Sequence, residues 1–108
     1  MSIVFGVLQE EYERLQQLAA KYRENIAGLP KGSLQIKTRN GHGYVYLTYR
    51  DRQKVISKYI GKVGSLQVEE LLQQVNERKQ YEQKLKRVSK DLHEIRRVLH
   101  GKSGKPLH

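Results

Sequence analysis

The sequence predicts an α+β fold made of a long helix, a three-stranded antiparallel meander and a second long helix. Apolar residues recur at steps of three and four in residues 5–29 and again in residues 85–99, as in paired helices. Between these segments, residues 33–61 alternate apolar and polar side chains, which is typical of strands. We therefore expect one domain over residues 1–101, in which the helices form an antiparallel coiled-coil-like hairpin, and a disordered basic tail at residues 102–108.

The first helix is expected over residues 7–27. We place its start after Gly6, because a glycine inside a helix costs about 1 kcal/mol relative to alanine. Gly28 suits the left-handed position after the last turn, and Pro30 cannot continue the helix. The expected apolar seam consists of Phe5, Leu8, Tyr12, Leu15, Ala19, Tyr22, Ile26 and Leu29.

The meander, residues 33–61, contains the strongest local signal. Asn40-Gly41 favours a two-residue type I′ turn, in which both central residues have positive φ. That turn would pair Arg39 with His42, Lys37 with Tyr44, Ile36 with Val45 and Leu34 with Leu47. One face would then carry Leu34, Ile36, Val45, Leu47 and Tyr49. Gly43 leaves a longer loop possible.

A second turn is expected in residues 50–53, followed by a third strand from Lys54 to Ile60. A loop of two or four residues places Ile56 and Ile60 on the apolar face, whereas a loop of three residues places Val55 and Tyr59 there. We favour the first arrangement, because it leaves Tyr59 beside Tyr44 and Tyr46.

The second helix is expected over residues 66–99, with Ser65 as its N-cap. Being the longer helix, it should extend past the first and leave a seam that nothing else in the chain covers. We expect a homodimer through this seam. Alternatively, a helix of another protein covers it. The simplest structural explanation is a single bent helix that folds on the sheet. The predicted seam residues are Leu85, Val88, Leu92, Ile95 and Leu99.

Composition excludes several functional classes. The chain has no cysteine, and its apolar runs are far shorter than the roughly 20 residues of a membrane span. A signal peptide is not recognisable at Met1–Phe5, so we expect a cytoplasmic protein without membrane association. Residues such as His93 and His100 are too far apart for a shared metal, and motifs of hydrolases or P-loops are missing. We expect no enzyme activity, metal or cofactor.

Positive charge is concentrated in the meander. The whole chain has a formal net charge of +10, and residues 31–63 hold eight basic residues against one acidic residue, Asp51. Such a segment favours nucleic acid as a partner, because lysine and arginine bind phosphates and tyrosine rings pack on sugars or bases. One face of the meander would carry Lys37, Arg39, His42, Tyr44, Tyr46 and, with the favoured third strand, Tyr59.

The second helix carries a further basic stripe at heptad positions opposite its apolar seam. Such a stripe could lie along a phosphate backbone, or it could be the solvated face of a coiled coil. Its members are Lys79, Lys86, Lys90, His93 and Arg97.

Two stretches carry a resemblance: residues 46–50, YLTYR, and residues 54–62, KVISKYIGK. They resemble the meander near the N-terminus of some transposases and the arm-type DNA-binding sheet of tyrosine recombinases. With residues 29–33, LPKGS, the segment is similar to small uncharacterised prokaryotic αβββα proteins. The resemblance to the DNA-binding modules covers roughly 30 residues with a loose motif. It implies DNA binding by Lys37, Arg39, Tyr44, Tyr46, Arg50, Lys58 and Lys62, in a regulatory or accessory role because no catalytic domain follows.

Together these observations predict a nucleic-acid-binding protein, with double-stranded DNA as the expected partner, accessory to a mobile element or a defence system. The alternative is an antitoxin-like or adaptor module that binds an acidic protein or a partner helix. The predicted nucleic-acid-binding residues are Lys37, Arg39, His42, Tyr44, Tyr46, Arg50, Arg52, Lys54, Lys58 and Lys62.

Overall fold

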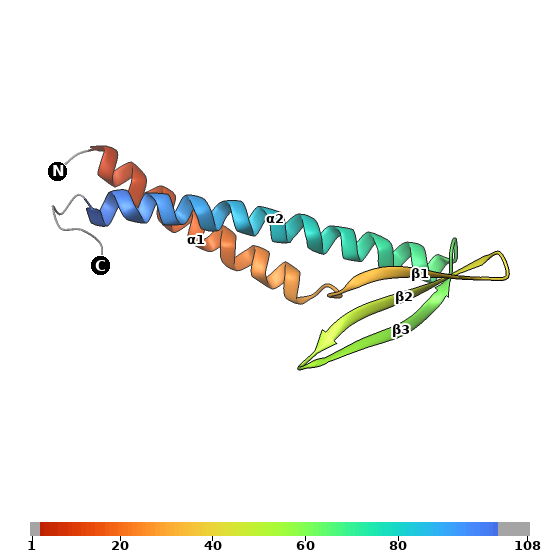
Figure 1. Cartoon of the computed structure of the whole chain (residues 1–108). Helices are drawn as coiled ribbons and strands as arrows, with labels where there is room; N and C mark the ends of the chain where they lie inside the picture. Colours follow the sequence, from red (N-terminus) through yellow and green to blue (C-terminus); the bar gives the residue numbers. More distant parts are fainter. Residues whose placement is uncertain (1–2, 102–108) are drawn as a thin grey trace. The chain divides into compact units, whose positions relative to one another are not determined.

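The computed structural model describes residues 3–101, and its elements follow in the predicted order (Figure 1). They are helix α1 (Ile3–Ala27), strands β1 (Ser33–Arg39), β2 (His42–Asp51) and β3 (Lys54–Lys62), and helix α2 (Leu66–Gly101). The predicted α+β class is confirmed. The described chain forms two compact units, one of residues 3–26 with 81–101 and one of residues 27–80. The single domain expected from the sequence stays a prediction. The predicted tail, residues 102–108, lies outside the described residues.

The first unit is a helical hairpin. Its core is formed by Leu15, Ala19 and Val88, which are 6%, 1% and 7% exposed. Around them pack partly buried side chains from both helices, namely Leu18, Tyr22, Leu85, Leu92 and Ile95. The helices run in opposite directions (Figure 1), and this confirms the predicted antiparallel hairpin.

This packing corrects the prediction of an uncovered seam. Leu85, Val88, Leu92 and Ile95 were expected to lie on a part of α2 that nothing in the chain covers, but they pack with Leu15 and Ala19 of α1. The reason is the antiparallel arrangement, which pairs the C-terminal half of α2 with α1. The fifth predicted residue, Leu99, is partly buried.

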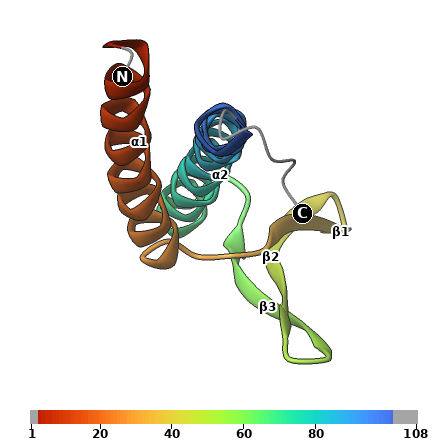
Figure 2. The ribbon, with the colours of Figure 1, turned by 90° about the vertical axis from the view of Figure 1, so that its left-hand side faces the viewer.

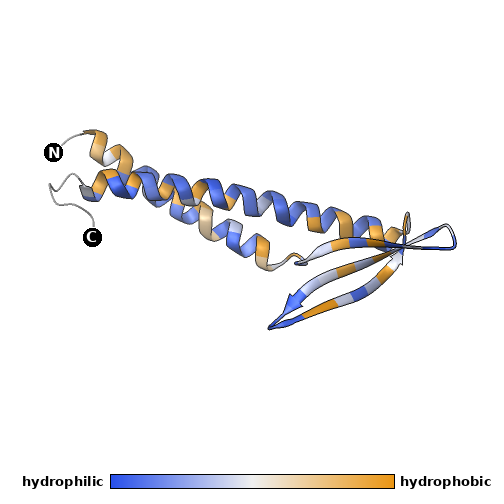
Figure 3. Cartoon of the chain, viewed as in Figure 1, coloured by the Kyte–Doolittle hydropathy of each residue, from blue (hydrophilic) through white to orange (hydrophobic). Residues whose placement is uncertain are grey.

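Helix α1 begins at Ile3, four residues before the expected start. Gly6 therefore lies inside the helix, and no atom lies within 4 Å of the position that a Cβ there would occupy. This glycine lowers the stability of the helix by about 1 kcal/mol relative to alanine, but the helix continues through it because each further residue adds a helical hydrogen bond. The apolar N-terminal turns of α1 are visible in Figure 3, and Ile3 is 86% exposed.

The second unit contains the sheet, in the order β1-β2-β3 with antiparallel neighbours. All four pairs predicted between β1 and β2 are present, from Leu34↔Leu47 to Arg39↔His42. Asn40 and Gly41 both have positive φ, 49° and 78°, as the predicted turn requires. The second turn has two residues, because Asp51 pairs with Lys54, and this places Ile56 opposite Tyr49 as favoured above.

The buried apolar residues of the second unit come from the sheet and from the first half of α2. Val45 and Leu47 of β2 are 2% and 8% exposed, and Val68 and Val75 of α2 are 6% and 3% exposed. Gly61 allows the close approach of the helix, because a Cβ there would lie 2.9 Å from Ser65 Oγ and 3.5 Å from Val68 Cγ2. The short connection from β3 to α2 can be followed in Figure 2.

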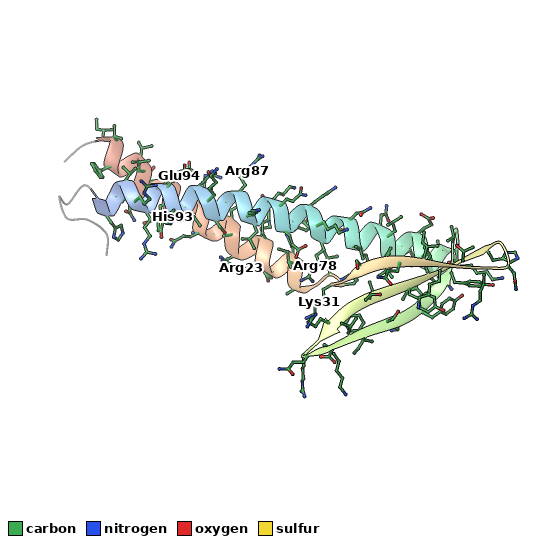
Figure 4. All side chains as sticks on the ribbon, in the orientation of Figure 1. Arg23, Lys31, Arg78, Arg87, His93 and Glu94 are labelled. Carbon is green, nitrogen blue, oxygen red and sulfur yellow. The ribbon has the colours of Figure 1, made fainter. Side chains whose placement is uncertain are left out.

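Two contacts complete this unit. Ser65 Oγ accepts a hydrogen bond of 3.4 Å from the Val68 amide, so Ser65 caps α2 as predicted. Arg78, labelled in Figure 4, donates from Nη1 to the Leu29 carbonyl oxygen at 2.8 Å. This bond ties the segment before β1 to α2.

Candidate nucleic-acid interface

The sheet has a second face, opposite Val45 and Leu47, which we call the open face. Strand register assigns residues to it, because partners across an antiparallel pair project to the same side. Three rows follow from the register: Arg39 with His42, Lys37 with Tyr44 and Lys62, and Gln35 with Tyr46 and Tyr59.

Three tyrosine rings gather on the open face. The Tyr59 ring centroid lies 5.3 Å from that of Tyr46 and 6.3 Å from that of Tyr44, with interplanar angles of 60° and 51°. Tilted rings at these distances have the geometry of favourable aromatic pairs. Tyr59 is 50% exposed, so half of its surface is accessible to solvent. The favoured arrangement of the third strand, with Tyr59 beside the other two tyrosines, is confirmed.

A cation lies against this cluster. Lys37 Nζ is 4.5 Å from the Tyr46 ring centroid, which is within the range of a cation–π contact. Lys37, Arg39, Tyr44, Tyr46 and Tyr59 line a shallow hollow with a volume of about 260 Å³. The hollow therefore combines aromatic walls with two positive groups.

A β-bulge brings Lys62 to this side of the sheet. Tyr46 pairs with Tyr59, but the next residue of β2, Val45, pairs with Gly61, so Ile60 is an extra residue in β3. Such a residue shifts the alternation of side chains along the strand. Without the bulge, Lys62 would point away from Tyr59; with it, Lys62 pairs with Tyr44. Sequence alternation alone does not reveal this placement.

The predicted residues of the β2–β3 hairpin do not all join the open face. Arg50 lies on it, six residues from Tyr44 along β2, which is about 20 Å at 3.3 Å per residue. Arg52 lies in the turn with a φ of 59°. Lys54 pairs with Asp51 and Lys58 pairs with Leu47, so both belong to the opposite side. For Lys58 the reason is its position next to Tyr59 in a regular part of the strand.

The basic side chains of the sheet are not neutralised by acidic ones. Within residues 33–62, all of which the structure describes, Asp51 is the one acidic residue, and no salt bridge involves a basic side chain there. Both hairpin ends are hydrophilic in Figure 3. The open face therefore presents positive charge that is available to an external anion.

The basic stripe of α2 differs from the open face. Lys79, Lys86, Lys90, His93 and Arg97 are all exposed, as predicted. Lys86 and Lys90, however, line a shallow surface hollow together with the acidic residues Asp91 and Glu94. Interleaved acidic and basic groups are typical of the solvated face of a helix, so we do not include the stripe in the interface.

Other kinds of site find little support among the described residues. Within residues 3–101, no three histidine, aspartate or glutamate side chains come together as metal ligands would. Nor does this part of the chain contain a helix whose length and apolar character would let it cross a membrane.

A comparison with protein families identifies the family of this chain. A family model described as a domain of unknown function, DUF6788, matches residues 8–73, and the chain belongs to this family. The match begins in α1, includes all three strands and ends in α2, so it contains the whole open face. Searches of curated proteins and of solved structures found no match.

Proposed function

We propose that this DUF6788 protein binds double-stranded DNA through the open face of its sheet, without catalysis. The observation that carries the proposal is the row Lys37–Tyr44–Lys62, in which two cations flank a tyrosine and no acidic side chain neutralises them. Arg39 and His42 extend the row toward the β1–β2 turn. Groups of this kind bind phosphates through charge and hydrogen bonds.

The arrangement suits a polyanion with regularly spaced charges. Lys37, Arg39 and Lys62 form one basic group, and Arg50 lies about 20 Å away on the same face. Polar side chains, including Gln35 and Tyr46, occupy the sheet between them. In this proposal the two basic positions hold separate phosphates, and the side chains between them face the DNA.

The resemblance to transposase and tyrosine-recombinase sheets supports the same partner, and an accessory role in a mobile element or defence system remains part of the proposal. The homodimer was predicted because the seam was expected to be uncovered, but most of the seam residues are packed against α1. A single copy of the sheet is sufficient for the binding that we propose.

Salt dependence provides the first test. If four to six phosphates are neutralised, the logarithm of the binding constant should fall with the logarithm of salt concentration at a slope of about −3.6 to −5.4. Filter binding to a DNA duplex measures this slope. Binding that does not change with salt, or no binding at low salt, would contradict the proposal.

Two lysines of β3 provide a matched pair of variants. Lys62→Ala removes a cation from the open face, and Lys58→Ala removes one from the other side of the same strand. We expect Lys62→Ala to weaken binding and to reduce the magnitude of the salt slope by about 1. Lys58→Ala should change both much less, although it alters the net charge equally.

Equal effects of the two variants would show that net charge, rather than the open face, determines binding. If duplex DNA is not retained but an acidic protein is, and Lys37→Glu with Arg39→Glu abolishes that contact, the adaptor alternative would replace DNA binding.

A further inference from the structure

We infer that the hollow at Tyr44, Tyr46 and Tyr59 takes an unpaired nucleotide of a DNA strand that is otherwise duplex. The inference rests on the proposed function and adds to it a preference for DNA containing a bulge, a mismatch or a frayed end. Its basis is the shape and chemistry of the hollow, which differ from those of the rest of the open face.

Tyr59 is the most exposed of the three tyrosines. Lys37 Nζ already lies 4.5 Å from the Tyr46 centroid. Tyr59 is within 6.3 Å of both other tyrosines and is still 50% exposed. Tyr59 therefore offers the ring surface on which a flat ligand can stack.

The size of the hollow suits one ring system. Its volume of about 260 Å³ is below the range of roughly 300–1,000 Å³ that is typical of sites for drug-sized ligands. Lys37 and Arg39 also line it, so a planar group bound there would have cations beside it for an attached phosphate. A nucleotide combines these two features in one ligand.

A base inside a regular duplex cannot use this surface. Its two faces are covered by neighbouring bases, and only its edges are presented in the grooves. Stacking on an aromatic side chain requires a base that has left the stack, as in single strands, loops and bulges. The three tyrosine rings also line a hollow rather than a flat surface, and Tyr59 is inclined by 51° to Tyr44 and by 60° to Tyr46.

The experiment compares a perfect DNA duplex with the same duplex carrying a short bulge of unpaired thymines. We expect the unmodified protein to bind the bulged duplex about 5- to 140-fold more tightly, the factor that one base–aromatic stack provides. Tyr59→Ala and Tyr59→Leu should lose this preference, whereas Tyr59→Phe should keep it because stacking needs the ring and not the hydroxyl. A circular dichroism spectrum checks that each variant is folded.

Two readouts separate stacking from a general structural effect. Tyr59→Ala should leave the salt slope of binding to the perfect duplex unchanged, since tyrosine carries no charge that neutralises a phosphate. Permanganate, which oxidises the exposed double bond of an unstacked thymine, should react less with the bulge when the unmodified protein is bound, and this protection should be absent with Tyr59→Ala.

The outcomes distinguish the two proposals. Equal affinity for both duplexes, or a preference that Tyr59→Ala retains, would overturn the nucleotide site and leave duplex binding intact. No binding to either duplex at low salt would overturn both. Tighter binding to the RNA version of the bulged duplex than to the DNA version would overturn the assignment to DNA.

Discussion

The two compact units use the same helix against different partners. In the first, Val88 of α2 packs with Leu15 and Ala19 of another helix. In the second, Val68 and Val75 of α2 are buried together with Val45 and Leu47 of a sheet. Apolar residues thus continue along α2 at steps of about three and four, but the spacing does not identify the element that covers them. Heptad spacing indicates that a helix face is buried, and the covering element must be found from the rest of the chain.

The units also differ in charge. Strand residues 33–62 hold seven basic residues and one acidic residue, whereas α1 holds three basic and four acidic residues. A sheet with one covered face can concentrate charge on the other face, since each side chain is assigned to a side by the alternation of the strand. The helical hairpin has its charges distributed around both helices.

The largest effect is expected from a charge placed in either core. Val75→Asp and Val88→Asp each bury a carboxylate without a partner, which should lower the free energy of unfolding by about 4 kcal/mol or more. Amide hydrogen exchange distinguishes the units. Val75→Asp should remove protection from the strands, whereas Val88→Asp should remove it from α1 and leave the strands protected.

Loss of protection throughout the chain in both variants would show that the two units unfold together. The two units would then differ in packing but not in stability.

A smaller effect is expected at two glycines of the sheet unit. Gly32 has a φ of 118°, and a Cβ there would lie 2.5 Å from the Thr48 carbonyl oxygen, so Gly32→Ala should cost about 3 kcal/mol. Gly41 has a φ of 78° but no atom within 4 Å of the Cβ position, so Gly41→Ala should cost about 1 kcal/mol. Urea unfolding measures both, and equal costs would show that the close contact at Gly32 relaxes.

The smallest effect should have the opposite sign. Gly6→Ala in α1 replaces a glycine inside a helix where a Cβ meets nothing within 4 Å, so it should stabilise the helical unit by about 0.5–1 kcal/mol. Thermal unfolding followed by circular dichroism measures the gain. A loss of stability would indicate that the first turn of α1 is not helical in solution.

Much of the fold could be predicted because its signals are local. Asn40-Gly41 determines a turn through its backbone preference, and the register of β1 and β2 follows from that turn. Pro30 marks the end of α1, which ends at Ala27, in a similar way, whereas Gly28 was expected to have a positive φ and does not. These features depend on a few neighbouring residues, so the sequence was sufficient for them.

The features that were missed depend on distant partners. Val68 and Val75 are buried but were not predicted as core residues, because their spacing does not identify the element that covers them. The position of Lys62 depends on how β3 aligns with β2. Lys58 was predicted as a site residue because the sequence shows its charge but not the side of the sheet to which it projects. Tyr59 was expected only if the third strand had the favoured arrangement.

The extra residue at Ile60 has a consequence for how β3 tolerates change. Tyr59 and Lys62 are three positions apart and yet share one side of the sheet. From Lys54 to Tyr59 the odd-numbered residues lie on the open face, whereas after Ile60 the even-numbered Lys62 lies there. Among related sequences, the hydrophobic and polar requirements along β3 should therefore change phase at this residue. Deleting Ile60 would restore a regular strand with the same partners, Gly61 opposite Val45 and Lys62 opposite Tyr44, so that Lys62 keeps its side of the sheet and Gly61 still faces the start of α2.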